Sequence, residues 1–168
     1  MNQQVAYILI IEDEPITLRQ LSSHFKQEGY IVTDVADADG VLERIGEGDI
    51  DLCLLDINLP GKDGQTLTRE IRAKFDIGII MVTGKDNQID RIVGLESGAD
   101  DYMTKPFDPR ELLSRVKNLL RRVRAQEKQK EKGFIRKLEG WTVDLNKREL
   151  STLPAGDSRY LQESSNCC

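Results

Sequence analysis

Short apolar runs alternate with helix-like patterns from residue 5 to residue 124, and this alternation restricts the possible folds more than any other feature. Five runs predict β-strands, because they are short, apolar and bounded by turn residues. They are residues 5–11 (VAYILII), 30–35 (YIVTDV), 51–56 (DLCLLD), 77–83 (IGIIMVT) and 100–104 (DDYMT). Apolar strands that alternate with helices predict a parallel sheet covered on both faces.

The segments between these runs carry apolar residues three and four positions apart, which predicts amphipathic helices. The apolar positions are Leu18, Leu21 and Phe25; Leu67, Ile71 and Phe75; Ile89, Ile92 and Val93; and, after a start at Asp108-Pro109, Leu112, Leu113, Val116, Leu119, Leu120 and Val123. The commonest doubly wound α/β sheet with this many strands has the order 2-1-3-4-5. It binds ligands outside the carboxyl ends of strands one and three.

Length, charge and cysteine content exclude several classes of protein. The 168 residues are enough for one well-buried domain and part of another, and the net charge of −5 argues against a general nucleic-acid binder. The apolar run 7–11 is too short for a signal peptide or a membrane span. Because Cys53, Cys167 and Cys168 form no disulfide framework and no metal spacing, we expect a cytoplasmic protein without membrane attachment.

The character of the sequence changes after residue 120. Residues 121–133 are strongly basic and mostly polar, and we expect a frayed helix end that runs into a linker. Residues 134–150 resume apolar positions and predict two or three short antiparallel strands, whereas the remaining tail has no periodicity. The expected parts are therefore a domain over 1–124, a basic linker over 125–133 and a short β-rich fragment over 134–168.

Polar side chains stand where the predicted strands end. Glu12, Asp13 and Glu14 follow the first strand, Asp56 ends the third, Thr83 ends the fourth and Lys105 follows the fifth. Because the carboxyl ends of parallel strands meet at one edge of a sheet, we expect these side chains to share one pocket. Taken alone, each has a simpler explanation, and Asp13 suits the cap of a helix that begins at Pro15.

Crowded carboxylates repel each other unless a cation or protons intervene. Mg²⁺ suits such a site, since it prefers oxygen ligands and is commonly held by one or two carboxylates and a phosphate. Lys105 adds a mobile positive charge that can contact a carboxylate or a phosphoryl oxygen, and Thr83 adds a hydroxyl. These groups predict phosphoryl transfer in which Asp56 is the nucleophile and becomes an acyl phosphate.

Four motifs, IEDEP (11–15), LLDINLPGKDG (54–64), VTG (82–84) and GADDYMTKPF (98–107), resemble those of two-component response regulator receiver domains, which have a flavodoxin-like fold. The resemblance implies that a histidine kinase or phosphotransfer protein phosphorylates Asp56. It implies that Asp13, Asp56 and the Asn58 carbonyl bind Mg²⁺, with Glu12 acting through water. It also implies that Thr83 and Tyr102 form a switch pair, that Lys105 binds the phosphoryl group and that Lys105-Pro106 is cis.

Residues 90–122 are similar to the OmpR/PhoB type of transcription factor, and residues 134–150 to the first strands of its winged-helix effector domain. In that type a dimer forms on phosphorylation through the fourth helix, fifth strand and fifth helix. The charged pairs that the resemblance implies are Arg91 with Glu111, Glu96 with Lys117 and Asp101 with Arg115. Residues 56–64 and 140–150 lean toward the respiratory-control regulators of this type.

The resemblance stops before the recognition helix and wing that would enter a DNA groove. The sequence is either truncated or frameshifted, or the protein has lost its DNA-binding part. We expect transcriptional control by the full-length type, with DNA as a partner only where a complete effector domain is present. The alternative is a receiver-only module that acts by dimerisation or as a phosphate sink.

Two other functions of this fold fail at particular residues. A haloacid dehalogenase-type phosphatase needs a general acid two residues after its nucleophile, where this chain has Asn58, so we expect no enzyme beyond the protein's own phosphorylation and slow dephosphorylation. A nucleotide or flavin site needs glycine-rich backbone where residues 12–14 would repel a phosphate. We interpret His24, the only histidine, as a surface residue and not a phosphohistidine.

Overall fold

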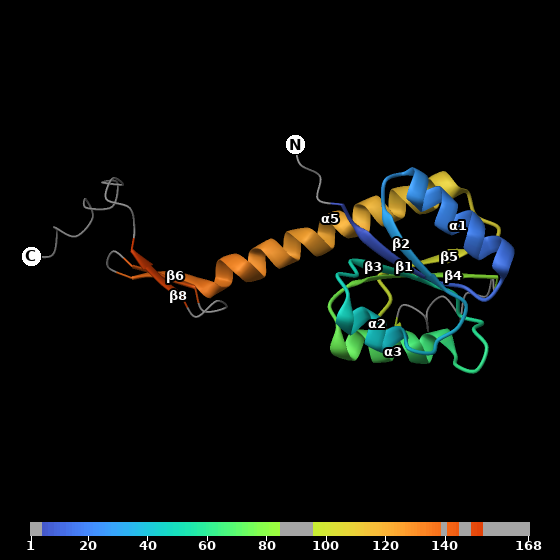
Figure 1. Ribbon diagram of the computed structural model, residues 1–168, viewed down its shortest axis with the longest axis horizontal. Coiled ribbons are helices and arrows are strands. Elements are labelled where there is room, and N and C mark those ends of the chain that lie inside the picture. The colour runs from blue at the N-terminus through green and yellow to red at the C-terminus, as the bar shows by residue number, and fades with distance from the viewer. Residues whose placement is uncertain (1–4, 85–95, 139–140, 145–148, 153–168) are drawn as a thin grey trace, which may run out of the picture. The chain divides into compact units, whose positions relative to one another are not determined.

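The computed structural model describes residues 5–84, 96–138, 141–144 and 149–152. The chain divides into two compact units, Met1–Arg124 and Ala125–Cys168. The first unit contains a five-stranded parallel sheet with the strand order β2-β1-β3-β4-β5 (Figure 1). This is the order that the sequence predicts, so the doubly wound α/β fold is confirmed.

Each predicted strand is present and is one or two residues shorter than the apolar run that predicts it. The strands are β1 (Tyr7–Ile11), β2 (Ile31–Val35), β3 (Leu52–Leu55), β4 (Gly78–Thr83) and β5 (Asp101–Thr104). Every residue of β3 and β4 is buried, as expected for central strands covered on both faces. In the register, Ile11 pairs with both Val35 and Leu55, which places the carboxyl ends of β1, β2 and β3 level with one another.

Helices cover both faces of this sheet. They are α1 (Pro15–Gln27), α2 (Val41–Glu47), α3 (Gly64–Lys74) and α5 (Pro109–Phe134). Figure 1 shows α1 and α5 on one face and α2 and α3 on the other. The helix predicted around Ile89, Ile92 and Val93 lies outside the described residues.

The sheet separates two apolar cores, because successive side chains of a strand point to opposite faces. Ile8 and Ile10 of β1 belong to the core with α1 and α5, which includes Phe25. Leu9 and Ile11 belong to the core with α2 and α3, which includes Ile71. Burial on both faces holds the central strands firmly. The first residue of each loop that follows such a strand is therefore held in a defined position.

The N-terminus of α1 differs from the expectation for Asp13. Glu14 is the N-cap residue, with extended backbone, and Pro15 occupies the first turn. The cap makes no side-chain hydrogen bond to the helix backbone, and the Asp13 side chain is exposed in the loop before it. Asp13 is therefore not the helix cap and stays available to the acidic cluster at the strand ends.

Helix α5 continues to Phe134, through residues 125–133, where the sequence analysis expected a frayed end and a linker. Before Gly133 the segment consists of Gln, Glu and Lys with one Ala, and all of these residues have high helix propensities. Helix propensity therefore outweighs the absence of an apolar face in this segment.

The second unit contains a three-stranded antiparallel sheet, as its apolar positions predict. Its strands are β6 (Ile135–Leu138), β7 (Trp141–Asp144) and β8 (Glu149–Thr152), in the order β6-β7-β8. The tail 153–168 lies outside the described residues. Among the residues that the structure describes, no helix has the length and hydropathy required to cross a membrane.

Candidate functional site

Three side chains from separate strand ends meet at the carboxyl edge of the sheet. Lys105 Nζ donates hydrogen bonds to Glu12 Oε2 at 2.6 Å and to Asp56 Oδ2 at 2.7 Å. The Lys105 side chain is 19% exposed, and the two carboxylates are 2% and 6% exposed. The site is thus a pair of buried carboxylates that share one ammonium group.

The backbone holds these residues in place by extending the sheet beyond the strands. The amides of Glu12, Asp56 and Lys105 donate to the carbonyls of Val35, Ile11 and Thr83 at 3.1, 2.9 and 2.7 Å. Each functional residue therefore keeps one ladder hydrogen bond to a neighbouring strand. The Lys105-Pro106 peptide bond is cis, as the resemblance implies.

For both Glu12 and Lys105, burial and the charge of the partner group change the pKa in opposite directions. Burial raises the pKa of Glu12 above its ordinary value, and the hydrogen bond and positive charge of Lys105 offset this only in part. Burial lowers the pKa of Lys105, but hydrogen bonds and attraction from Asp56 and Glu12 outweigh it, so this pKa is raised. Lys105 is therefore firmly protonated at neutral pH.

Asp13 completes an acidic cluster with Glu12 and Asp56, whose carboxylate oxygens lie within 4.8 Å of one another. Asp13 is exposed and the other two are buried. Even with Lys105 present, these carboxylates outnumber the positive charge. Carboxylate oxygens grouped at a partly open edge are suitable ligands for a hard divalent cation such as Mg²⁺, so the residues present fit the expected metal.

The loop after β3 orients Asp56 from its other side. The Asn58 amide donates to Asp56 Oδ1 at 3.0 Å, while the Asn58 side-chain amide donates to Thr83 Oγ1 at 3.4 Å. Asn58 thus connects Asp56 to the hydroxyl at the end of β4. The predicted side chains at the ends of β1, β3, β4 and β5 therefore meet in this site, with the exception of Glu14, whose carboxylate accepts a hydrogen bond from Thr17 of α1.

Gly64, the first residue of α3 and the last residue of the motif at 54–64, was not predicted as a site residue. Its amide donates to the Ile57 carbonyl at 2.9 Å. A Cβ at this position would lie 2.4 Å from the Asp56 carbonyl oxygen and 2.7 Å from Ile57 Cα. Only glycine lets the start of α3 pack this closely against the backbone of Asp56. Gly64 therefore has a structural role in the site, although it has no side chain that could react or bind a ligand.

The two residues expected to act as a switch pair are both buried. Thr83 is fully buried at the end of β4, and Tyr102 is 5% exposed. Tyr102 lies in the apolar core shared with α2 and α3, near Ile79 and Met81 of the neighbouring strand.

The charged residues expected at a dimer interface also form contacts within the chain. Arg115 binds Asp101 at 2.8 Å and Glu111 at 2.7 Å, and these bonds raise its pKa. Lys117 lies 3.4 Å from Glu28 of α1. Glu96 is exposed, and Arg91 lies outside the described residues.

His24 is less exposed than a surface residue of α1 was expected to be. Its ring packs edge-on against Phe25, with ring centroids 5.5 Å apart. Its Nε2 atom is buried and has no hydrogen-bond partner among the described residues. His24 is therefore half-buried at the surface of α1, and one of its two ring nitrogens is shielded from solvent.

The chain is similar in sequence and in structure to known proteins. Residues 8–117 match the family model described as "Response regulator receiver domain". The Escherichia coli K12 aerobic respiration control protein ArcA is 44% identical over 166 residues, which cover 96% of this chain and 68% of ArcA. The TorCAD operon transcriptional regulatory protein TorR of the same strain is 55% identical over 117 residues, which cover 70% of this chain and 51% of TorR.

Solved structures agree with these matches. The crystal structure of the receiver domain of the TMAO respiratory system response regulator TorR has a TM-score of 0.67 and 54% identity, covering 70% of this chain and 98% of that one. A CheY-like receiver domain from Methanospirillum hungatei has a TM-score of 0.69 and 31% identity, covering 73% of this chain and 99% of that one. Both matches cover nearly the whole length of an isolated receiver domain.

Proposed function

The chain belongs to the response regulator receiver family, and we propose that Asp56, in a receiver domain of residues 1–124, accepts a phosphoryl group from a histidine kinase or a phosphotransfer protein. The observation that carries this proposal is the double hydrogen bond of Lys105 to Glu12 and Asp56. A buried carboxylate beside an acidic cluster and a mobile ammonium is the arrangement that phosphoryl transfer to an aspartate requires.

In the proposed reaction a carboxylate oxygen of Asp56 attacks the phosphorus of the phosphohistidine. The bond between phosphorus and the donor's imidazole nitrogen breaks, and the imidazole, which carries a proton on its other ring nitrogen, leaves with that electron pair. The product is an acyl phosphate on Asp56 and a neutral imidazole on the donor. The Asn58 amide, which already binds Asp56 Oδ1, keeps the nucleophile oriented.

Glu12, Asp13 and Asp56, with the carbonyl of Asn58, would hold Mg²⁺, with Glu12 acting through water. When bound, the ion supplies positive charge to the carboxylates and the incoming phosphoryl oxygens. The exposed position of Asp13 leaves this part of the cluster open to a solvated ion.

Lys105 has a separate role after transfer. Conversion of Asp56 into an acyl phosphate removes its carboxylate, so Lys105 can exchange that partner for a phosphoryl oxygen while it keeps Glu12. The Thr83 hydroxyl, at the end of β4, would bind another phosphoryl oxygen, and Tyr102 would respond as the second switch residue. Movement at Thr83 and Tyr102 would carry the signal to β5 and α5.

The acyl phosphate should persist, because the residue two positions after Asp56 is Asn58 and cannot act as a general acid. A lasting phosphorylated state suits a regulator better than a phosphatase. The protein would promote its own Mg²⁺-dependent phosphorylation and slow dephosphorylation without acting on another substrate.

For the output, we propose a phosphorylation-dependent dimer through the surface that carries Arg91, Glu96, Asp101, Glu111, Arg115 and Lys117. The names of ArcA and TorR describe regulatory proteins, and transcriptional control in the cytoplasm is the output we propose for the full-length type. Residues 134–152 would be the start of its winged-helix effector domain after a linker segment. A receiver-only module that dimerises or stores phosphate is the second candidate, and the compact unit of residues 1–124 supports it because that unit contains every residue of the proposed phosphoacceptor site.

Intact-mass measurement after incubation with acetyl phosphate and Mg²⁺ tests the proposal. The wild type should gain one phosphoryl group, and Asp56→Asn should gain none. Asp39→Asn, an exposed aspartate outside the cluster, is the matched control and should behave as the wild type. Undiminished labelling of Asp56→Asn would show that another residue is the acceptor.

A further inference from the structure

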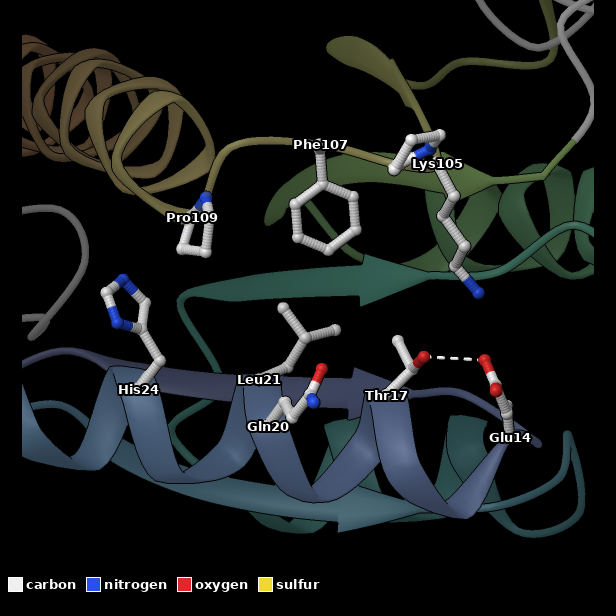
Figure 2. A pocket seen from close by; sticks show the side chains of 9 residues that line it. Glu14, Thr17, Gln20, Leu21, His24, Lys105, Phe107 and Pro109 are labelled. Carbon is white, nitrogen blue, oxygen red and sulfur yellow. Dashed lines mark hydrogen bonds between the residues drawn. The ribbon is translucent and has the colours of Figure 1, made fainter.

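A pocket of about 440 Å³ lies beside the phosphoacceptor site, between α1 and the segment that joins β5 to α5 (Figure 2). This volume falls in the range of about 300–1,000 Å³ that small-molecule sites occupy. The stem of Lys105 forms one wall of the pocket. No step of the proposed phosphoryl transfer uses this space.

The walls of the pocket are mainly apolar. Leu21 of α1 faces the side chains of Pro106, Phe107 and Pro109 across the gap. Figure 2 shows the Phe107 ring directed into the space above Leu21. Phe107 packs only partly against the core of α1 and α5, which leaves part of its ring available to another molecule. The aromatic ring of Phe107 on one side favours a planar aromatic partner.

Hydrogen-bonding groups follow one stripe of α1. Thr17, Gln20 and His24 are three and four positions apart, so they lie on the same side of the helix and all line the pocket. His24 Nε2 is buried without a hydrogen-bond partner among the described residues, which costs free energy in the unliganded protein. A ligand with one or two polar groups could bind along this stripe, and rotation of the imidazole about Cβ–Cγ would let the nitrogen share in that contact.

The charged groups at the pocket already have partners. Lys105 Nζ is bound to Glu12 and Asp56, and the Glu14 carboxylate accepts a hydrogen bond from Thr17 at 2.6 Å. A charged ligand would lose hydration against apolar walls without gaining an uncommitted counter-ion. An uncharged ligand avoids this cost.

We propose that this pocket binds a small uncharged aromatic molecule that carries one or two hydrogen-bonding groups. The molecule stacks on Phe107, contacts Leu21 and the proline rings, and hydrogen-bonds to the polar stripe of α1. Binding in this pocket does not depend on phosphorylation of Asp56. Acetyl phosphate labelling tests the phosphoacceptor site and a ligand titration tests the pocket, so each result stands without the other.

Indole is a suitable probe, because it is flat, uncharged and has one N–H donor. The full chain would be titrated with indole and followed by ¹H–¹⁵N NMR, with benzoate and benzylamine as charged comparators. Gln20→Trp fills the pocket from an exposed position, and Gln27→Trp adds the same side chain to an exposed position of α1 that does not line it. His24→Phe keeps a ring but removes the imidazole nitrogens.

Indole should produce saturable shifts in the amides of residues 17–24 and 105–109, with weaker binding of both charged probes. Gln20→Trp should weaken indole binding by about tenfold or more, a loss above 1.4 kcal/mol, while Gln27→Trp should leave it unchanged. His24→Phe should weaken it by about threefold to tenfold, the effect of one hydrogen bond. Equal binding to both Trp variants, or tighter binding of a charged probe, overturns the proposal. Failure of indole to saturate these amides also overturns it.

Discussion

Lys105 Nζ and Asp56 Oδ2 are 2.7 Å apart, although 49 positions separate the two residues in the sequence. The contact exists because β3 and β5 end at the same edge of one parallel sheet, on either side of β4. Lys105 also holds Glu12, so a single ammonium group connects the ends of three strands. Removal of this ammonium group should therefore have a measurable effect on stability.

Lys105→Met should destabilise the protein at neutral pH, because Glu12 and Asp56 stay buried without their cation. The expected loss is about 3 kcal/mol in the free energy of unfolding, measured by urea denaturation in metal-free buffer. The loss should shrink in acid, where Glu12, whose pKa is raised, binds a proton. Lys62→Met is the control: Lys62 pairs with Glu70 on the surface and should cost less than about 1 kcal/mol. Equal losses would contradict the central role of Lys105.

Glu12→Gln should change how stability depends on pH. Burial raises the pKa of Glu12 above 4.5, so the folded protein binds this proton more tightly than the unfolded chain does. Protonated Glu12 therefore favours the folded state and ionised Glu12 opposes it. The stability that Glu12 protonation contributes is fully present below pH 4.5 and is lost as pH rises toward the folded-state pKa. The stability of the variant relative to the wild type should rise through this window in urea unfolding experiments. Glu47→Gln, at an exposed position, should show no such trend.

Asp13→Asn should weaken Mg²⁺ binding, because it removes the exposed carboxylate of the acidic cluster. Mg²⁺ at about 100 times its dissociation constant should stabilise the wild type by about 2.7 kcal/mol. The variant should gain less at the same concentration, as measured by thermal unfolding with Mg²⁺ or with a chelator. Asp37→Asn removes an exposed aspartate outside the cluster and should retain the full gain. An unchanged response of Asp13→Asn would remove Asp13 from the proposed ligands.

Gly64→Ala should destabilise the fold and disturb Asp56 together. The added Cβ would meet the Asp56 carbonyl oxygen at 2.4 Å, so the loop before α3 must shift. We expect a loss of about 1–3 kcal/mol or more, the usual cost of overpacking, and slower labelling by acetyl phosphate. At Gly84 a Cβ would meet no atom of the described residues within 4 Å, so Gly84→Ala should leave stability nearly unchanged. Similar stability of the two variants would contradict the close packing inferred at Gly64.

Arg115→Glu should reduce phosphorylation-dependent dimerisation. It reverses the charge that binds Asp101 and Glu111 and places three acidic side chains together on the proposed interface. Sedimentation of the phosphorylated protein should show less dimer for Arg115→Glu than for the wild type. Arg121→Glu, an exposed change farther along α5, should have a smaller effect. If neither the wild type nor the control gains mass on phosphorylation, the proposed dimer is wrong.

The sequence by itself determined the fold and the location of the site. Alternating apolar and amphipathic segments leave few arrangements except a parallel sheet covered on both faces, and the order β2-β1-β3-β4-β5 follows from that class. The polar residues at the strand ends then had to meet, since parallel strands bring their carboxyl ends to one edge. Glu12, Asp56 and Lys105 could be grouped on that argument alone.

Only the tertiary structure decided which atoms touch and how closely. Pattern and propensity describe neighbours along the chain, whereas the hydrogen bonds of Lys105, the close approach of Gly64 to Asp56 and the burial of His24 Nε2 depend on packing between distant segments. The same limit explains why Asp13 could be taken for a helix cap, since cap geometry depends on where the loop turns toward α1. Periodicity selects the faces of helices and strands, but the distances between atoms on those faces are set when the side chains fill the core.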